Sequence, residues 1–98
     1  MICTVAEWTV KEGRVDDFER RWQELADGLI PDYPSLTFRL FRDHANPRRF
    51  VGLTEGWRNL EQVETVQSLP GYQNSVAAIW RVVDGGETAT LELAVEIS

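Results

Sequence analysis

The stretch FVGLTEGWRNLEQV at residues 50–63 decides the fold, because a strand pattern in its first half runs directly into a helix start in its second half. Side chains alternate between the two faces of a strand. This alternation predicts that Glu55 and Trp57 share one face of the strand. Asn59 then stands at an N-cap position, with Gln62 three residues later as the second member of a capping box. A strand, an indole and a helix start are therefore expected in immediate succession.

Strand and helix patterns flank this stretch on both sides. Apolar residues alternate with polar ones in the strand segments and recur every three or four residues in the helical segments. The expected strands are residues 2–10, 36–42, 50–57 and 88–97. The expected helices are residues 15–29, residues 60–68 and a segment after Pro70-Gly71 that carries Val76, Ile79, Trp80 and Val83. Asp84-Gly85-Gly86 is expected to end this last helix in a turn, and residues 43–47 are expected to join two antiparallel strands as a hairpin.

The order of these elements predicts an α+β fold. Strand, helix, strand, strand, helix, strand with right-handed crossovers gives a ferredoxin-like βαββαβ sandwich, in which helices cover one face of a four-stranded antiparallel sheet. We expect a single domain over residues 1–98. The other face of the sheet would expose Cys3, Val5, Leu91 and Val95, an apolar surface larger than monomers usually tolerate. A homodimer closed sheet against sheet is therefore expected.

The composition argues against several classes of protein. The 98 residues are 43% hydrophobic and 27% charged, as in one ordinary globular domain that neither is disordered nor spans a membrane. A formal net charge of -6 argues against nucleic acid, which is bound by clustered Lys and Arg. The single cysteine, Cys3, allows no internal disulfide and no multi-thiolate metal site. We recognise no secretion signal, so a cytoplasmic protein is expected.

Several segments carry a resemblance to a known family. They are residues 10–14 before a helix with Phe18 and Trp22, Pro34 before residues 36–40, residues 46–50, and residues 55–59. On these segments the chain resembles the antibiotic biosynthesis monooxygenase family over nearly its whole length. The resemblance implies a dimeric ferredoxin-like α/β barrel. It also implies cofactor-free oxygenation, in which an acidic phenol or anthrone loses a proton and the resulting anion reduces molecular oxygen directly.

The resemblance also bears on haem. Some members of the family degrade haem, and their strand Asn, helical Trp and haem-ligating His fall on Ala6, Val66 and Val76 of this chain. Haem iron needs a strong axial donor, and the sole histidine, His44, lies in the expected hairpin turn. Haem is therefore not expected. No phosphate-binding glycine loop, nucleophile elbow or metal-spaced cluster points to NAD, FAD or zinc. The resemblance implies molecular oxygen as co-substrate and no cofactor.

The expected site is an aromatic-lined pocket between the sheet and the helices. The resemblance matches Trp57 to a Trp at the end of the third strand of the family's oxygenases. Tyr72 and Arg81 are expected to orient a phenolate or a carbonyl of the substrate, and with Trp57 they form the expected catalytic group. The residues expected to contact the substrate are Trp8, Trp22, Leu53, Val63, Val76 and Trp80.

Alternatives remain for some of these residues and for the function. Trp8 and Trp57 also fit the pattern of plain core residues. Glu55 suits a general base with a raised pKa, although we favour a salt bridge with Arg39 on the neighbouring strand. The leading hypothesis is a cofactor-free monooxygenase that acts on a planar aromatic, polyketide-like or quinol substrate. The alternatives are a non-catalytic binding or accessory dimer, and an isomerase or cyclase on the same fold.

Overall fold

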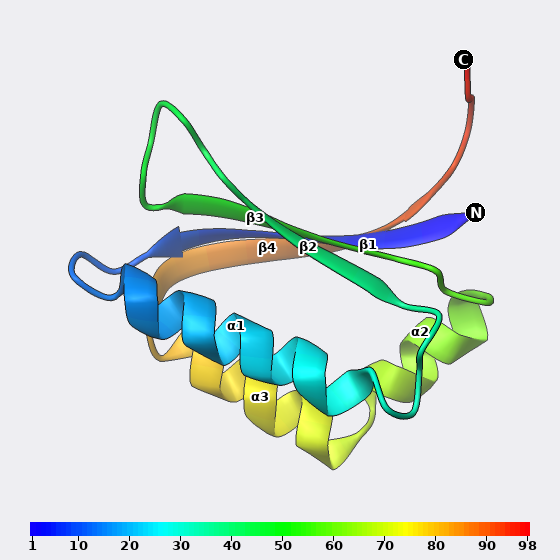
Figure 1. Ribbon diagram of the computed structural model, residues 1–98, viewed down its shortest axis with the longest axis horizontal. Helices are drawn as coiled ribbons and strands as arrows, with labels where there is room; N and C mark the ends of the chain where they lie inside the picture. The colour runs from blue at the N-terminus through cyan, green and yellow to red at the C-terminus, as the bar shows by residue number, and fades with distance from the viewer.

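The computed structural model describes residues 1–98 and confirms the ferredoxin-like fold (Figure 1). The strands are β1 (Ile2–Val10), β2 (Thr37–Arg42), β3 (Arg49–Glu55) and β4 (Val83–Glu92), and the helices are α1 (Val15–Leu29), α2 (Leu60–Gln67) and α3 (Pro70–Trp80). The four strands form one antiparallel sheet in the order β2-β3-β1-β4. Figure 1 shows the helices on one side of this sheet and the other side uncovered. The split of the second helical segment at Pro70-Gly71 is also confirmed.

The hydrophobic core lies between the sheet and the helices near the end of β1. It is formed by residues from β1, α1, β3, α3 and β4, namely Trp8, Val10, Phe18, Phe50, Ile79, Val82 and Val83. Even-numbered residues of β1 face the helices, as the alternation predicts, and Trp8 and Val10 are buried there. Toward the start of β1 the same face carries Thr4 and Ala6, which are too small to fill the layer between sheet and helices, before it ends at Ile2. The core therefore closes one half of the sandwich and leaves the other half open.

A charged network ties α1 to α3. Asp17 accepts hydrogen bonds from Arg14, Arg20 and Arg21, the last at 2.9 Å. The hydrogen bonds from Arg21, which has the larger effect, and from Arg14 hold the pKa of the Asp17 carboxyl well below its usual range. Arg21 also donates to the carbonyl oxygen of Ala78 in α3 at 2.7 Å. The carboxylate thus orients the arginine that joins the two helices.

The capping box at the start of α2 forms as predicted, with one change. The backbone N–H of Gln62 donates to Oδ1 of Asn59 at 2.8 Å. In return, Oε1 of Gln62 accepts a 2.7 Å hydrogen bond from the backbone N–H of Arg58, one residue before the N-cap. Both bonds satisfy donors at the helix start and determine where the chain leaves the sheet.

The prediction that Glu55 and Trp57 share one face of the strand was wrong. The strand ends at Glu55, and Gly56 has a φ of 93°, which breaks the alternation. Trp57 consequently turns to the helix side of the sheet, where its indole N–H donates to Oγ1 of Thr4 at 3.2 Å. Glu55 stays on the uncovered side, and the favoured salt bridge with Arg39 forms at 3.4 Å.

The predicted bounds of the last helix and last strand were also wrong. β4 begins at Val83 and runs through Asp84-Gly85-Gly86, so these residues form a strand instead of a turn. Gly86 pairs with Trp8 of β1, and a Cβ atom on it would lie 2.5 Å from Cε3 of the Trp8 indole. The glycine is therefore required by a close approach of strand and indole.

The strand also ends earlier than the alternation predicts. Residues 93–98 have no regular structure, because β1 begins at Ile2 and offers no further residues to pair with. A single hydrogen bond continues past the ladder, from the backbone N–H of Leu93 to the carbonyl of Met1 at 2.8 Å. In Figure 1 this last segment curves away from the helices, toward the uncovered side of the sheet.

We expect Gly56→Ala to destabilise the fold by about 2–4 kcal/mol. The positive φ disfavours a side chain, and the new Cβ would lie 2.0 Å from the carbonyl oxygen of Ser35. Urea unfolding followed by circular dichroism measures the free energy of unfolding. Gly71→Ala is the matched control, since nothing lies within 4 Å of its Cβ position in the first turn of α3. It should leave stability unchanged or raise it by up to about 1 kcal/mol; equal losses in the two variants would contradict this account.

Candidate functional site

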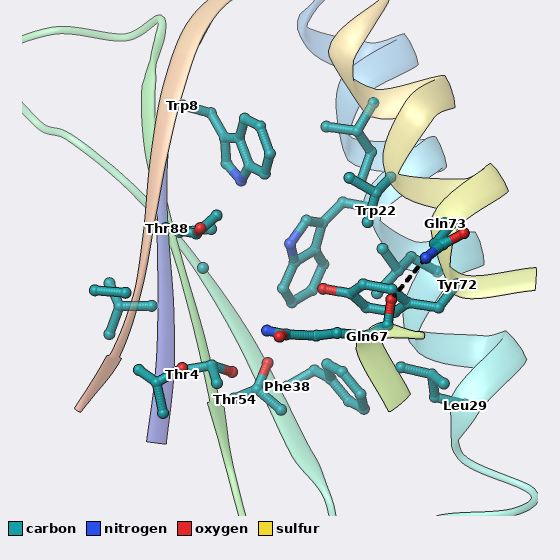
Figure 2. A pocket seen from close by; sticks show the side chains of 18 of the residues that line it. Thr4, Trp8, Trp22, Leu29, Phe38, Thr54, Gln67, Tyr72, Gln73 and Thr88 are labelled. Carbon is teal, nitrogen blue, oxygen red and sulfur yellow. Dashed lines mark hydrogen bonds between the residues drawn. The ribbon is translucent and has the colours of Figure 1, made fainter. Parts of the chain in front are cut away.

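A cavity of about 630 Å³ occupies the open half of the sandwich (Figure 2), within the range of about 300–1,000 Å³ typical of small-molecule sites. Its floor is the sheet, and its walls come from α1, α3 and the end of α2. The floor is made of residues from three strands, the small helix-facing residues Thr4, Ala6, Gly52, Thr54, Thr88 and Thr90 together with Val5 and Ala89, whose side chains point to the other face of the sheet. Small side chains on the floor are what create the space.

Aromatic side chains form most of the walls. Trp22 of α1 packs edge to face against Phe38 of β2, with ring centroids 6.2 Å apart. Its indole lies over Gly52 of the floor, where a Cβ atom would come within 3.0 Å of Nε1. At the core end, Trp8 meets Trp80 edge to face at 5.1 Å. These rings present flat apolar surfaces, which suit a planar ligand.

The polar groups of the cavity are uncharged. Besides the floor threonines, Gln67 and Gln73 contribute amides, and Nε2 of Gln73 donates to the backbone carbonyl of Gln67 at 3.2 Å. This bond bridges the junction between α2 and α3 at the edge of the cavity (Figure 2). No Asp, Glu, His, Lys or Arg is among the lining residues. The cavity therefore offers hydrogen bonds and stacking, but no side chain that is ionised at neutral pH.

Tyr72 is the one titratable residue that lines the cavity, and burial raises the pKa of its phenol above the usual 10.0. Desolvation disfavours the charged phenolate. Tyr72 is therefore a neutral hydrogen-bond donor and acceptor at physiological pH. Figure 2 shows its hydroxyl directed into the cavity beside Trp22.

No cluster of three or more His, Cys, Asp or Glu side chains is placed to hold a metal ion. His44 lies exposed in the turn between β2 and β3, as predicted. No helix combines the length and the apolar content of a membrane span.

The sequence also matches a known protein family. The family model described as antibiotic biosynthesis monooxygenase matches residues 1–78. The chain belongs to this family. No curated protein sequence matches it.

Solved structures of antibiotic biosynthesis monooxygenases and related oxygenases share the fold. A protein from Deinococcus radiodurans assigned to these monooxygenases is 16% identical, with a TM-score of 0.84 over 100% of this chain and 97% of that one. SnoaB, a cofactor-independent oxygenase from Streptomyces nogalater, is 16% identical, with a TM-score of 0.83 over 98% of this chain and 95% of that one. A Caulobacter crescentus protein of the same assignment is 19% identical, with a TM-score of 0.81 over 97% and 90%. At such identities these matches establish the fold alone.

Most of the predicted site residues of this antibiotic biosynthesis monooxygenase domain lie together around the cavity. The cavity is lined by Trp8, Trp22, Trp57, Tyr72, Val76 and Trp80. Three predicted residues lie elsewhere. Leu53 is on the uncovered face of β3, because the strand alternation that brings Gly52 and Thr54 to the floor turns Leu53 away.

The other two predicted residues, Val63 and Arg81, lie outside the cavity because of their positions in α2 and after α3. Val63 is buried in α2, at 1% exposure, and does not line the cavity. Arg81 follows the last residue of α3 and is exposed, so it does not reach the cavity. The expectation that Arg81 orients a substrate oxygen is therefore not supported by its position.

Sequence reasoning missed the floor and the amides. The alternation in β3 already places Gly52 and Thr54 opposite Leu53, and a small residue facing a helix layer is a signal for empty space. Thr88 and Thr90 were obscured by the wrong start of β4. Gln67 and Gln73 had no signal, because polar residues at helix ends usually face solvent.

The pKa of Tyr72 gives a direct test of the cavity's low polarity. In an ultraviolet absorbance titration of the tyrosinate band, Tyr72→Phe should remove a component that titrates above pH 10, because burial opposes phenolate formation. Tyr33→Phe, the control with the other tyrosine removed, should leave that component in place. Loss of a component below pH 10 in Tyr72→Phe would mean that the site is open to water.

Proposed function

We propose that this protein binds a planar aromatic, polyketide-like or quinol molecule in the cavity and oxidises it with molecular oxygen, without a cofactor. The observation that carries the proposal is a cavity of substrate size whose walls are aromatic and whose polar groups are all neutral. Membership of the antibiotic biosynthesis monooxygenase family supports the reaction class. The likeness to SnoaB, a cofactor-independent oxygenase, supports the absence of a cofactor.

The chemistry fits an electron-rich phenol or anthrone. The substrate loses a proton to give a carbanion or phenolate, which transfers an electron to oxygen; the two radicals combine to form a carbon–oxygen bond. The resulting hydroperoxide loses water, so that one CH₂ group and one O₂ become one C=O group and one H₂O. A dry apolar cavity favours this sequence, because it keeps water away from the anion and gives oxygen access to it.

The protein contributes no carboxylate or imidazole as a base. The lining residues are uncharged, and Tyr72 keeps its proton because its pKa is raised. The substrate proton therefore leaves to solvent through the open side of the cavity. Trp57, at the end of β3, and Tyr72, on α3, hold the ring system from different elements. Both residues position the ring, and the Tyr72 hydroxyl also stabilises charge on a substrate oxygen atom.

Oxygen uptake with a panel of anthrone, naphthol and quinol substrates tests this proposal. Turnover should exceed the uncatalysed rate and rise with pH through the pKa of the substrate itself. Trp57→Phe should lower kcat/KM about fivefold, because it removes aromatic surface from the cavity wall and the hydrogen bond to Thr4 that fixes the ring. No rate above background, with no effect of Trp57→Phe, would rule out the oxygenase.

The same panel separates the alternatives. Saturable quenching of tryptophan fluorescence without oxygen uptake would support a non-catalytic binding protein, a function that the absence of an ionised side chain in the cavity also suits. Product formed in the absence of oxygen would support an isomerase or cyclase.

We also propose that the active form is a homodimer closed through the uncovered face of the sheet. Phe41 and Leu91 on this face are 52% and 47% exposed. Cys3, Val5 and Leu53 lie between them, on the same side of β1 and β3. This apolar band is flanked by ion pairs, Arg49 to Glu7 at 2.7 Å and Arg39 to Glu55 at 3.4 Å. An apolar centre with a charged rim is typical of protein interfaces.

Analytical ultracentrifugation at micromolar concentration should show a species of twice the chain mass. Phe41→Glu should weaken association by roughly tenfold or more, because it buries a charge in the apolar band of the interface. Leu60→Glu is the matched control, since Leu60 is 53% exposed but lies on α2. A wild-type protein that sediments only as a monomer would contradict the dimer.

A further inference from the structure

The indole N–H of Trp8 has no hydrogen-bond partner, although Trp8 is only 4% exposed. It is the only buried side-chain nitrogen or oxygen of the protein left unpaired. Buried polar groups in folded proteins are nearly always paired, so each exception calls for an explanation. An indole nitrogen donates and cannot accept. The missing partner is therefore a hydrogen-bond acceptor.

The unpaired N–H points into the cavity. Trp8 is among the lining residues, and Figure 2 shows its nitrogen directed to the space between Thr88 and Trp22. The indole of Trp57 in the same cavity differs, because its N–H is already bonded to Thr4 at 3.2 Å. The indole N–H of Trp57 is thus occupied within the protein, whereas the indole N–H of Trp8 is free for a ligand.

Packing prevents the Trp8 indole from turning to find a partner in the protein. One side of the ring lies against Gly86, where even a Cβ atom would come within 2.5 Å. Phe18 and Trp80 hold it by edge-to-face contacts at 6.4 and 5.1 Å. The position of the donor is therefore set by the fold before any ligand arrives, which reduces the entropy lost on binding.

We infer that the Trp8 indole N–H binds an acceptor oxygen, a carbonyl or a phenolate, of the ligand. This inference rests on the proposed function and specifies the ligand that it takes: a planar ring system with an oxygen atom at the core end of the cavity. Because no cationic side chain lines the cavity, neutral donors carry the recognition. A hydrogen bond to an anionic oxygen is stronger than one to a neutral oxygen. The Trp8 donor consequently favours the deprotonated substrate and compensates for the missing base.

A matched pair of unreactive probes tests the donor. 9-Fluorenone and fluorene are both planar tricyclic molecules, and only fluorenone carries a carbonyl. Isothermal titration calorimetry on the wild-type protein should show fluorenone binding about five- to tenfold more tightly than fluorene. In Trp8→Phe this preference should fall to within about twofold. The ratio of the two affinities cancels any general loss from the smaller ring.

Trp22→Phe removes another indole donor of the same cavity, and it should retain the preference for fluorenone. A preference lost in Trp22→Phe and kept in Trp8→Phe would overturn the inference. Equal binding of the two probes to the wild-type protein would overturn it as well, while leaving the proposed ring-binding cavity intact. Failure of both probes to bind would overturn the proposed function itself, and the inference with it.

A second measurement needs no folded variant. In a proton–nitrogen correlation spectrum of the wild-type protein, the Trp8 indole N–H should move downfield with fluorenone relative to its position with fluorene, because a new hydrogen bond deshields the proton. Its cross-peak is identified as the one absent from Trp8→Phe or, if that variant does not fold, by through-space contacts to Phe18 and Trp80. Identical positions in the two complexes would contradict the inference.

Discussion

The close approach of the Trp8 indole to the backbone of β4 is the contact on which both the core and the cavity depend. Gly86 leaves room for the ring. The large side chain therefore fits between the sheet and the helices that cover it. On one side of Trp8 the layer is filled by Phe18, Phe50 and Ile79. On the other side β1, β3 and β4 present only small residues to the helices, such as Ala6, Gly52 and Thr88. The indole therefore acts as the boundary between a packed interior and a cavity.

Much of the fold is predictable from local patterns. Alternation in β1 and β2 and helical spacing in α1 each concern a single element with one buried face, and these predictions hold. Asn59 and Gln62 are equally local, and the predicted cap at α2 forms. The errors at Gly56 and Gly86 have a common cause. Gly56 was expected inside a strand and Gly86 in a turn, but whether a glycine serves a turn, a change of face or a close approach depends here on Ser35 and Trp8, which are distant in sequence.

The site was predicted in part, for a related reason. Tryptophans are recognisable as pocket candidates because they are large and few, and all four line the cavity. The space between them is made by threonines, alanine and glycine, which carry no signal unless the facing element is known. Leu53 was placed wrongly because it was expected to share a face with Trp57, and Gly56 breaks the alternation between them. Arg81 was placed wrongly because α3 ends just before it.

The neutral floor of the cavity has an evolutionary consequence. Exchanging Thr54, Thr88 or Thr90 for another small residue changes the shape of the cavity without leaving a charge buried, so the cost to folding is small. The strands that carry these residues are held by backbone pairing, which does not depend on the side chain. New ligand preferences can therefore arise by single substitutions while the fold persists. The Deinococcus radiodurans protein has this fold with a TM-score of 0.84 at 16% identity, so very different sequences form the same scaffold.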